Sequence, residues 1–229
     1  MFAVWNDMCG NGISEQDVHL RSYPAIQVLA EKLWKGKNNH ISYEDFERLC
    51  KQMPEAPGVN LLARIPEDCN LTPNGQILTL NGTDSIPTSL QEVGYPYTVS
   101  FKICPDTDSP MSTVLFKGPH SVFYANWENT RRFAFSRDGY TFVFQSYRLP
   151  ENEWTDIRIE GDYKGTSLYV NGKLEERLEG RIMKVYRKQY NRMEYMKYQE
   201  TLIFPLKYIG DKLNGFKGKI KDVKCTQLK

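Results

Sequence analysis

The spacing of apolar residues along the chain changes near residue 68. Before that point, apolar side chains recur every three or four positions, which is the period of one helix face. One such run follows Pro24, a residue favoured at the start of a helix, and another follows Ser42, whose hydroxyl can cap a helix. We therefore predict two helices with the apolar positions Ile26, Leu29, Ala30 and Leu33, and then Phe46, Leu49, Cys50 and Met53.

From residue 69 onward, short runs rich in β-branched and aromatic residues are separated by turn residues. About ten such runs in roughly 160 residues favour an antiparallel β-sandwich. The dipeptides Asp138-Gly139 and Asn171-Gly172 mark two hairpins, because these residues tolerate the positive φ angles of tight turns. We predict a mainly β chain with a helical domain, 1–68, and a sandwich domain, 69–229.

Composition is that of a globular protein, with 229 residues, 40% hydrophobic residues and a net charge of +2. The chain has neither an apolar run long enough to span a membrane nor a signal-peptide pattern at its start. The segment 181–200 holds six basic and two acidic residues interleaved with tyrosines, which would suit nucleic acid or an acidic glycan. Because the rest of the chain is nearly neutral, we favour a solvated excursion between strands and expect no nucleic-acid partner.

Metal and cofactor signals are weak. Five cysteines form no Cys-x-x-Cys pair and three histidines lie far apart, so we predict no metal site and no cofactor. Asp106-Thr107-Asp108 could hold calcium, although such a pattern is more typical of an Asx turn. Cys104 and Cys225 could be bridged if their strands are neighbours.

The second half carries a specific resemblance. EWTDIRIEGDYKGTSLYVNGKL, followed after an excursion by YIGDKLNGFKGKIKDVKC, resembles the concanavalin-A-like, laminin-G-like jelly roll. We expect Trp154 and Ile157 to fill the space between two sheets, and Gly218 to let the last strand pass close to a neighbour. Enzymes, lectins and passive spacers all use this fold, so the resemblance alone does not identify a function.

The first half resembles the end of the barrel of family 20 glycoside hydrolases, the β-N-acetylhexosaminidases. The motifs, in order, are Trp5-Asn6-Asp7, Pro24-Ala25, Ala30-Glu31-Lys32-Leu33-Trp34 and Tyr43-Glu44-Asp45-Phe46. The resemblance implies that 1–68 is the last strand and helix region of a (β/α)8 barrel. A whole barrel needs about 250 residues, so the missing N-terminal barrel of the parent chain would be this fragment's partner.

The same resemblance implies two substrate-binding residues. Trp5 would form one wall of the pocket under a terminal N-acetylhexosamine, and Asp7 would accept hydrogen bonds from the sugar hydroxyls. Taken without their neighbours, Trp5 reads as a core tryptophan and Asp7 as a loop or cap acid.

Catalysis in family 20 uses the substrate's own acetamido group together with an adjacent Asp-Glu pair. No Asp-Glu dipeptide occurs in these 229 residues, so we predict no catalytic residues and an inactive fragment. The parent would be a secreted or periplasmic hydrolase that removes terminal N-acetylhexosamine from glycans. The alternatives are a carbohydrate-binding module and a passive spacer. The aromatic residues Tyr95, Tyr97, Trp127 and Tyr147 would stack on sugars in the former, although core positions are more usual for them.

Overall fold

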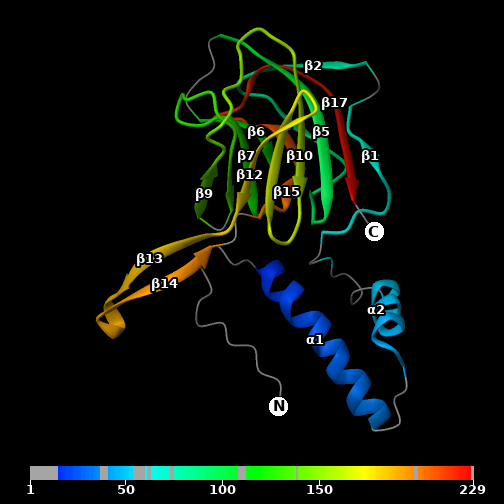
Figure 1. The fold of residues 1–229 in the computed structure, drawn as a ribbon. Helices are drawn as coiled ribbons and strands as arrows, with labels where there is room; N and C mark the ends of the chain where they lie inside the picture. The colour runs from blue at the N-terminus through cyan, green and yellow to red at the C-terminus, as the bar shows by residue number, and fades with distance from the viewer. Residues whose placement is uncertain are drawn as a thin grey trace. The chain divides into compact units, whose positions relative to one another are not determined.

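The computed structural model describes residues 15–36, 41–53, 60, 63–72, 75–107, 112–137, 139–198 and 201–227. The chain forms two compact units, Met1–Leu62 and Ala63–Lys229, whose elements are labelled in Figure 1. The second unit starts before residue 69 because the side chain of Gln227 ties the preceding segment to the sandwich. Its Oε1 accepts a hydrogen bond from the Ile65 N–H at 2.9 Å, and its Nε2 donates to the Gly94 carbonyl at 2.7 Å.

The first unit contains the helices α1 (Glu15–Lys35) and α2 (Tyr43–Gln52). The prediction for α2 is confirmed, since Ser42 Oγ accepts a hydrogen bond from the Asp45 N–H at 3.0 Å. The expectation that Pro24 begins this helix is wrong, since α1 begins at Glu15 and continues through Pro24 although proline inside a helix is unfavourable. The side chains of Ile26 and Leu33 are 44% and 77% exposed. Neither described helix is both long and apolar enough to cross a bilayer.

The second unit is a β-sandwich of two antiparallel sheets (Figure 1). One sheet has seven strands in the order β1-β17-β5-β10-β11-β12, and β2 also pairs with β17. Its strands are β1 (Cys69–Asn70), β2 (Ile77–Asn81), β5 (Tyr97–Pro105), β10 (Thr155–Gly161), β11 (Gly165–Val170), β12 (Lys173–Glu179) and β17 (Lys217–Gln227).

The facing sheet has six strands in the order β3-β16-β6-β7-β8-β9. They are β3 (Ser85–Pro87), β6 (Thr113–Lys117), β7 (Ser121–Asn126), β8 (Ala134–Arg137), β9 (Tyr140–Val143) and β16 (Tyr208–Gly210). Two further pairs stand apart from these sheets: β4 (Glu92–Val93) with β15 (Phe204–Pro205), and β13 (Arg181–Arg187) with β14 (Arg192–Tyr198). The basic run 181–200 thus contains a hairpin of its own.

Aromatic side chains fill the space between the two sheets. Phe101 of the seven-stranded sheet meets Phe116 of the facing sheet edge-on, with ring centroids 5.2 Å apart. Phe204 packs against both Phe116 and Phe123, at 5.3 Å in each case. All four side chains are at most 1% exposed, and burying each contributes about 2 to 3 kcal/mol. This cluster joins the sheets into one core.

The expectation that Trp154 fills this core is wrong, whereas Ile157 lies there as predicted. Ile157 is fully buried, but the Trp154 side chain is 41% exposed. Side chains alternate between the two faces of a strand. Because Thr155 and Ile157 face inward, Trp154 lies on the outer face. There the Nζ of Lys221 lies 4.5 Å from the centre of the indole ring.

Two predicted glycine roles are confirmed. In the turn between β11 and β12, Asn171 and Gly172 have φ angles of 49° and 82°, which suit a two-residue hairpin turn. Gly218 has a φ of 143°, and a Cβ there would lie 2.5 Å from the Cys104 carbonyl oxygen. Strand β17 therefore approaches β5 closely at this point.

Asp211 organises the turn that leads into β17. One carboxylate oxygen accepts a hydrogen bond from Lys117 Nζ at 2.6 Å. The other accepts from the N–H groups of Leu213 and Asn214, at 3.1 and 3.4 Å. Burial alone would raise the pKa of Asp211, but these hydrogen bonds outweigh burial and lower the pKa below its usual value.

We expect Asp211→Asn to reduce the free energy of unfolding at neutral pH by about 2 kcal/mol, because charge-assisted hydrogen bonds are lost. The folded pKa lies below the unfolded value of about 3.9, so the stabilisation is present above that pH and disappears as the pH falls through the folded pKa. Thermal unfolding from pH 7 to pH 3 should show the wild type and variant converging in acid. The exposed Asp156→Asn is the control, and a pH-independent difference would contradict the prediction.

The described cysteines lie in positions that the sequence did not indicate. Although β5 and β17 are neighbours, Cys225 faces Val99 and Cys104 faces Lys219 in their pairing. Cys104 is therefore about 17 Å along β5 from the position opposite Cys225, which is beyond the reach of a disulfide. Cys225 lies directly opposite Cys69 of β1, and both are free thiols. Burial raises the pKa of the Cys225 thiol to about 12, and the neighbouring Cys69 makes the second-largest contribution to this increase.

We expect oxidised glutathione to link Cys69 with Cys225 and not Cys104 with Cys225. The Cys69 thiolate would displace one glutathione thiol, and Cys225 would then displace the second, so that two thiols are oxidised and one glutathione disulfide is reduced. Closing a loop of about 155 residues should stabilise the fold by at most about 5 kcal/mol. Peptide mapping without reductant identifies the linked pair. Cys104→Ser should leave the link intact, whereas a Cys104-containing link would refute the assignment.

Candidate functional site

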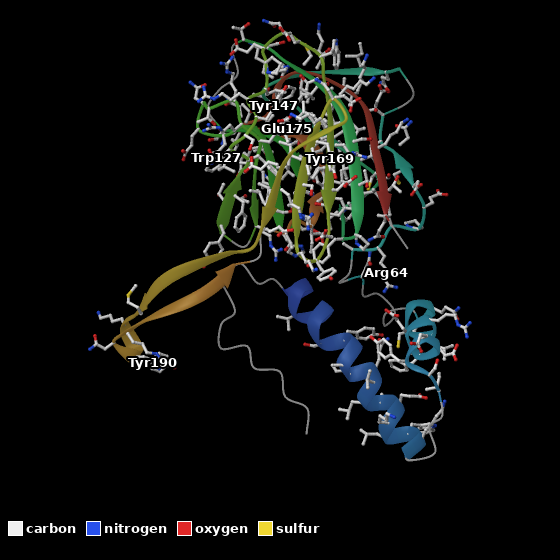
Figure 2. The ribbon with its side chains drawn as sticks, in the orientation of Figure 1. Arg64, Trp127, Tyr147, Tyr169, Glu175 and Tyr190 are labelled. Carbon is white, nitrogen blue, oxygen red and sulfur yellow. The ribbon has the colours of Figure 1, made fainter. Side chains whose placement is uncertain are left out.

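The substrate-binding residues predicted from the family resemblance, Trp5 and Asp7, lie outside the described residues. Of the predicted sugar-stacking aromatics, Tyr95 and Tyr97 are 9% and 1% exposed and belong to the core. Trp127 and Tyr147 are half-buried, and both are labelled in Figure 2. The Trp127 ring meets Tyr124 edge-on, with centroids 4.9 Å apart.

A narrow cleft with a cavity volume of about 30 Å³ opens to solvent at one end of the sandwich. Its walls come from the C-terminal ends of β5 and β7, the N-terminal ends of β6 and β17, and the segment before β10. Because neighbouring strands are antiparallel, these ends meet at the same edge of the two sheets. The apolar part of the lining is Pro105, Ala125, Leu149 and Phe216.

Backbone hydrogen bonds join the segments that form the cleft. The Asp106 N–H donates to the Lys217 carbonyl at 3.1 Å, which holds the end of β5 against the start of β17. The Asn152 N–H donates to the Pro105 carbonyl at 2.8 Å, and the Leu149 N–H donates to the Arg131 carbonyl at 2.7 Å. The cleft is therefore built on connected backbone.

The loop after β7 has an unusual backbone. Glu128, Asn129 and Arg131 have φ angles of 47°, 57° and 58°, a region that costs a non-glycine residue about 1 kcal/mol or more. Asn126 Oδ1 accepts a hydrogen bond from the Arg131 N–H at 2.7 Å and thereby closes the loop. Such clusters of strained residues are typical of functional sites. Here the loop places Asn129 and Arg131 in the cleft lining.

Thr113 lines the cleft and is fully buried. Its Oγ1 has no hydrogen-bond partner among the described residues. An unsatisfied buried hydroxyl costs about 1 to 3 kcal/mol, and a native structure rarely keeps one without a reason. A ligand or water in the cleft would satisfy this group.

The charged groups of the cleft have both signs. Arg131 Nη1 lies 3.7 Å from Glu151 Oε1, and Asp106 adds a second carboxylate to the lining. The side chains of Arg131 and Glu151 are 47% and 35% exposed, so their ion pair contributes little and can be exchanged for a ligand. The cleft thus offers hydrogen-bond donors and acceptors together.

A metal ion does not fit this arrangement well. Calcium prefers a cage of oxygen atoms, whereas the cleft includes the Arg131 guanidinium. Across the described residues, no group of three or more His, Cys, Asp or Glu side chains is placed to hold a metal. Asp108, the last residue of the Asp-x-Asp pattern considered for calcium, lies outside the described residues.

No protein-family model matches the chain, and no curated protein matches it. Solved structures with some likeness include domain 4 of AbnA, a GH43 extracellular arabinanase from Geobacillus stearothermophilus, in complex with arabinotriose. It is 15% identical, with a TM-score of 0.46 over 67% of this chain and 71% of that one. Galectin LEC-6 of Caenorhabditis elegans is 9% identical, with a TM-score of 0.35 over 71% and 96% of the two chains.

A third structure, β-fructofuranosidase of Aspergillus kawachii complexed with glycerol, is 13% identical, with a TM-score of 0.41 over 70% of this chain and 27% of that one. All three scores lie below 0.5 and all three identities below 25%. These likenesses therefore identify no ligand for this chain, and the cleft has to be interpreted from its own residues.

We expect Asn126→Ala to lower the free energy of unfolding by about 1 to 2 kcal/mol, because the Arg131 N–H loses its acceptor in a loop of strained residues. Asn126→Asp keeps an acceptor oxygen at the same place and should retain most of the stability. Urea denaturation measures both variants. Equal losses in the two would show that this hydrogen bond does not hold the loop.

Proposed function

We propose that the β-sandwich is a non-catalytic carbohydrate-binding module whose cleft receives a hydroxyl group of a bound sugar. The observation that carries the proposal is the buried Thr113 hydroxyl, which lines the cleft and lacks a partner among the described residues. A sugar hydroxyl can both donate and accept a hydrogen bond, so it would satisfy Thr113 whichever way that hydroxyl turns.

The remaining lining supports the same class of ligand. Sugar rings present hydroxyl groups around their edges and carbon-bound hydrogens on their faces. Arg131 and Asn129 would donate to the hydroxyl groups, and Asp106 and Glu151 would accept from them. Leu149 and Phe216 are 2% and 1% exposed, so they close the base of the cleft and exclude water from it. The two carboxylates disfavour a phosphate or other small anion, which would be repelled at short range.

The size of the cleft also limits the ligand. Its cavity volume is about 30 Å³, far below the roughly 300 to 1,000 Å³ of sites that enclose a small molecule. The cleft would therefore admit only the edge of a sugar residue, with one hydroxyl group reaching Thr113. The rest of the glycan would extend into solvent.

The finer identity of the glycan rests on the family 20 motifs. We propose N-acetylhexosamine-containing glycans as ligands, and a β-N-acetylhexosaminidase barrel as the partner that would precede these residues in a parent chain. Three of the motifs fall within α1 and α2, and Trp5-Asn6-Asp7 lies outside the described residues. Such a parent would be secreted or periplasmic, because its glycan substrates would be found outside the cytoplasm.

Thr113→Val tests the module, because valine has nearly the same shape as threonine but lacks the hydroxyl. Removing an unpartnered buried hydroxyl should leave the melting temperature unchanged or raise it, while weakening sugar binding roughly tenfold. Isothermal titration with a panel that includes N-acetylglucosamine, N-acetylgalactosamine and arabinose oligosaccharides measures the affinity of the wild type and variant.

Thr155→Val is the matched control, since Thr155 is 2% exposed and lies outside the cleft. It should not change sugar affinity. If no member of the panel binds the wild type, or if Thr113→Val binds as tightly as the wild type, the assignment of the cleft to sugar binding is wrong. Preference for the N-acetylated sugars would support the hexosaminidase origin, and its absence would oppose that origin without affecting the module.

A further inference from the structure

The outer face of the seven-stranded sheet carries a ladder of lysines. On β17, Lys219, Lys221 and Lys224 alternate with the buried residues Ile220, Val223 and Cys225. Lys102 of the neighbouring strand β5 lies directly opposite Lys221 and shares its face. Alternate positions of a strand lie about 7 Å apart, so the four ammonium groups form an extended cationic surface. We call these four residues the lysine ladder.

A bulge in β17 keeps the ladder on one face. Asp222 and Val223 together oppose a single residue of β5, and Asp222 has a φ of 55°. The extra residue changes the phase of the alternation, so that Val223 points into the core and Lys224 points outward. Without this change, Lys224 would point toward the buried aromatic residues.

The charges of the ladder are only partly balanced by neighbouring acids. Two lysines directly opposite on antiparallel strands repel each other and destabilise the sheet. None of the four makes an ion pair with a residue that the structure describes. The acids nearest the ladder are Asp156, which faces Lys102 from β10, and Asp222, which is half-exposed in the bulge. Glu160 is already paired with Arg158 at 3.2 Å. The surface keeps a net positive charge that a polyanion would neutralise.

The aromatic side chains beside the ladder are covered by cations. Lys221 Nζ lies over the Trp154 ring at 4.5 Å, and the Arg158 guanidinium lies over the Tyr169 ring at 4.0 Å. Tyr169, on β11, is labelled in Figure 2. Proteins that hold single-stranded nucleic acid stack bases on open aromatic faces, and here one face of each ring is already occupied. This favours a ligand that is read by its charge and not by base stacking.

We propose that the lysine ladder binds an acidic polysaccharide, through sulfate or carboxylate groups placed along its length. Lys219, Lys221 and Lys224 would engage successive anionic groups along β17, while Lys102 widens the contact toward β5. The acidic side chain of Asp156 lowers the charge density of the surface, which fits a polysaccharide better than the continuous phosphates of a nucleic acid. This surface is separate from the cleft, and neither assignment depends on the other.

The test replaces all four ladder lysines with glutamine, which keeps most of the apolar stem and removes the charge. The matched control replaces four exposed cations elsewhere, Lys164, Lys173, Lys188 and Arg192, and so makes the same change in net charge. It also removes two cations of the basic run 181–200. Circular dichroism and melting temperature establish that both variants are folded. Biolayer interferometry against heparin, chondroitin sulfate, polygalacturonate and neutral dextran then compares them with the wild type.

We expect the wild type to bind at least one acidic polysaccharide but not dextran. This binding should weaken as the salt concentration rises. The ladder variant should bind about tenfold more weakly or worse, while the control stays close to the wild type. If the control variant loses binding and the ladder variant does not, the hairpin is the site and the proposal is wrong. Absence of binding to all three acidic polymers would also overturn it.

Two further probes distinguish the partner class. A single-stranded oligonucleotide and vesicles with 30% phosphatidylserine, about the content of an anionic membrane surface, are tested with the same three proteins. Ladder-dependent binding to either of them that equals or exceeds binding to the polysaccharides would overturn the assignment. Thr113→Val should bind the acidic polysaccharides as the wild type does, so failure of the cleft proposal and failure of the ladder proposal have different signatures.

Discussion

Contact between Phe101 and Phe116 across the two sheets determines which face of each central strand is buried. Side chains alternate along a strand, so once Phe101 points inward, Val99 and Ile103 must do the same and Ser100 and Lys102 must face outward. Pairing transmits this constraint to β10 and β17, because residues directly opposite share a face. The buried cluster therefore also determines the composition of the open face, and the lysine ladder is a consequence of core packing.

The cleft depends on the same constraint in a different way. Its residues lie where strands end and where alternation no longer decides the direction of a side chain. Thr113 is at the first position of β6 and Asn126 at the last position of β7, and the register brings them opposite each other. The strained loop that follows Asn126 then adds Arg131. The rigid sandwich holds polar groups that belong to no single strand, which is the usual basis of a binding site on such a fold.

Local sequence signals predicted the local features of the fold. The helix cap at Ser42 and the turn at Asn171-Gly172 each depend on a few adjacent residues, and both are present. Trp154 was misplaced because it precedes β10 by one residue, so its face depends on the exact start of that strand. Cys69 lies opposite Cys225 because of the register between β1 and β17, the first and last strands of the sandwich in sequence. Neither strand determines this register alone.

The candidate site was less accessible to sequence analysis than the fold. Thr113 and Arg131 come from different segments of the chain. Only the tertiary structure shows that both line the cleft and that the Thr113 hydroxyl has no partner among the described residues. The run Asn126 to Thr130 is rich in turn residues, and that signal could have directed attention to the loop. Lys219, Lys221 and Lys224 are close together in the sequence, but their common face cannot be predicted from it. A strict period of two would put Lys224 on the opposite face, and the bulge prevents this.

The bulge at Asp222 also bears on how the length of β17 can vary. Removing that one residue would leave Lys221 outward, Val223 inward and Lys224 outward in an unbroken alternation, so the strand reads as a regular one that has accommodated an insertion. Aspartate is among the few residues that accept the left-handed backbone this requires. A deletion at 222 would thus be tolerated, whereas a deletion of Val223 would turn Asp222 toward the core. Homologues that lack residue 222 would keep the same buried and exposed faces.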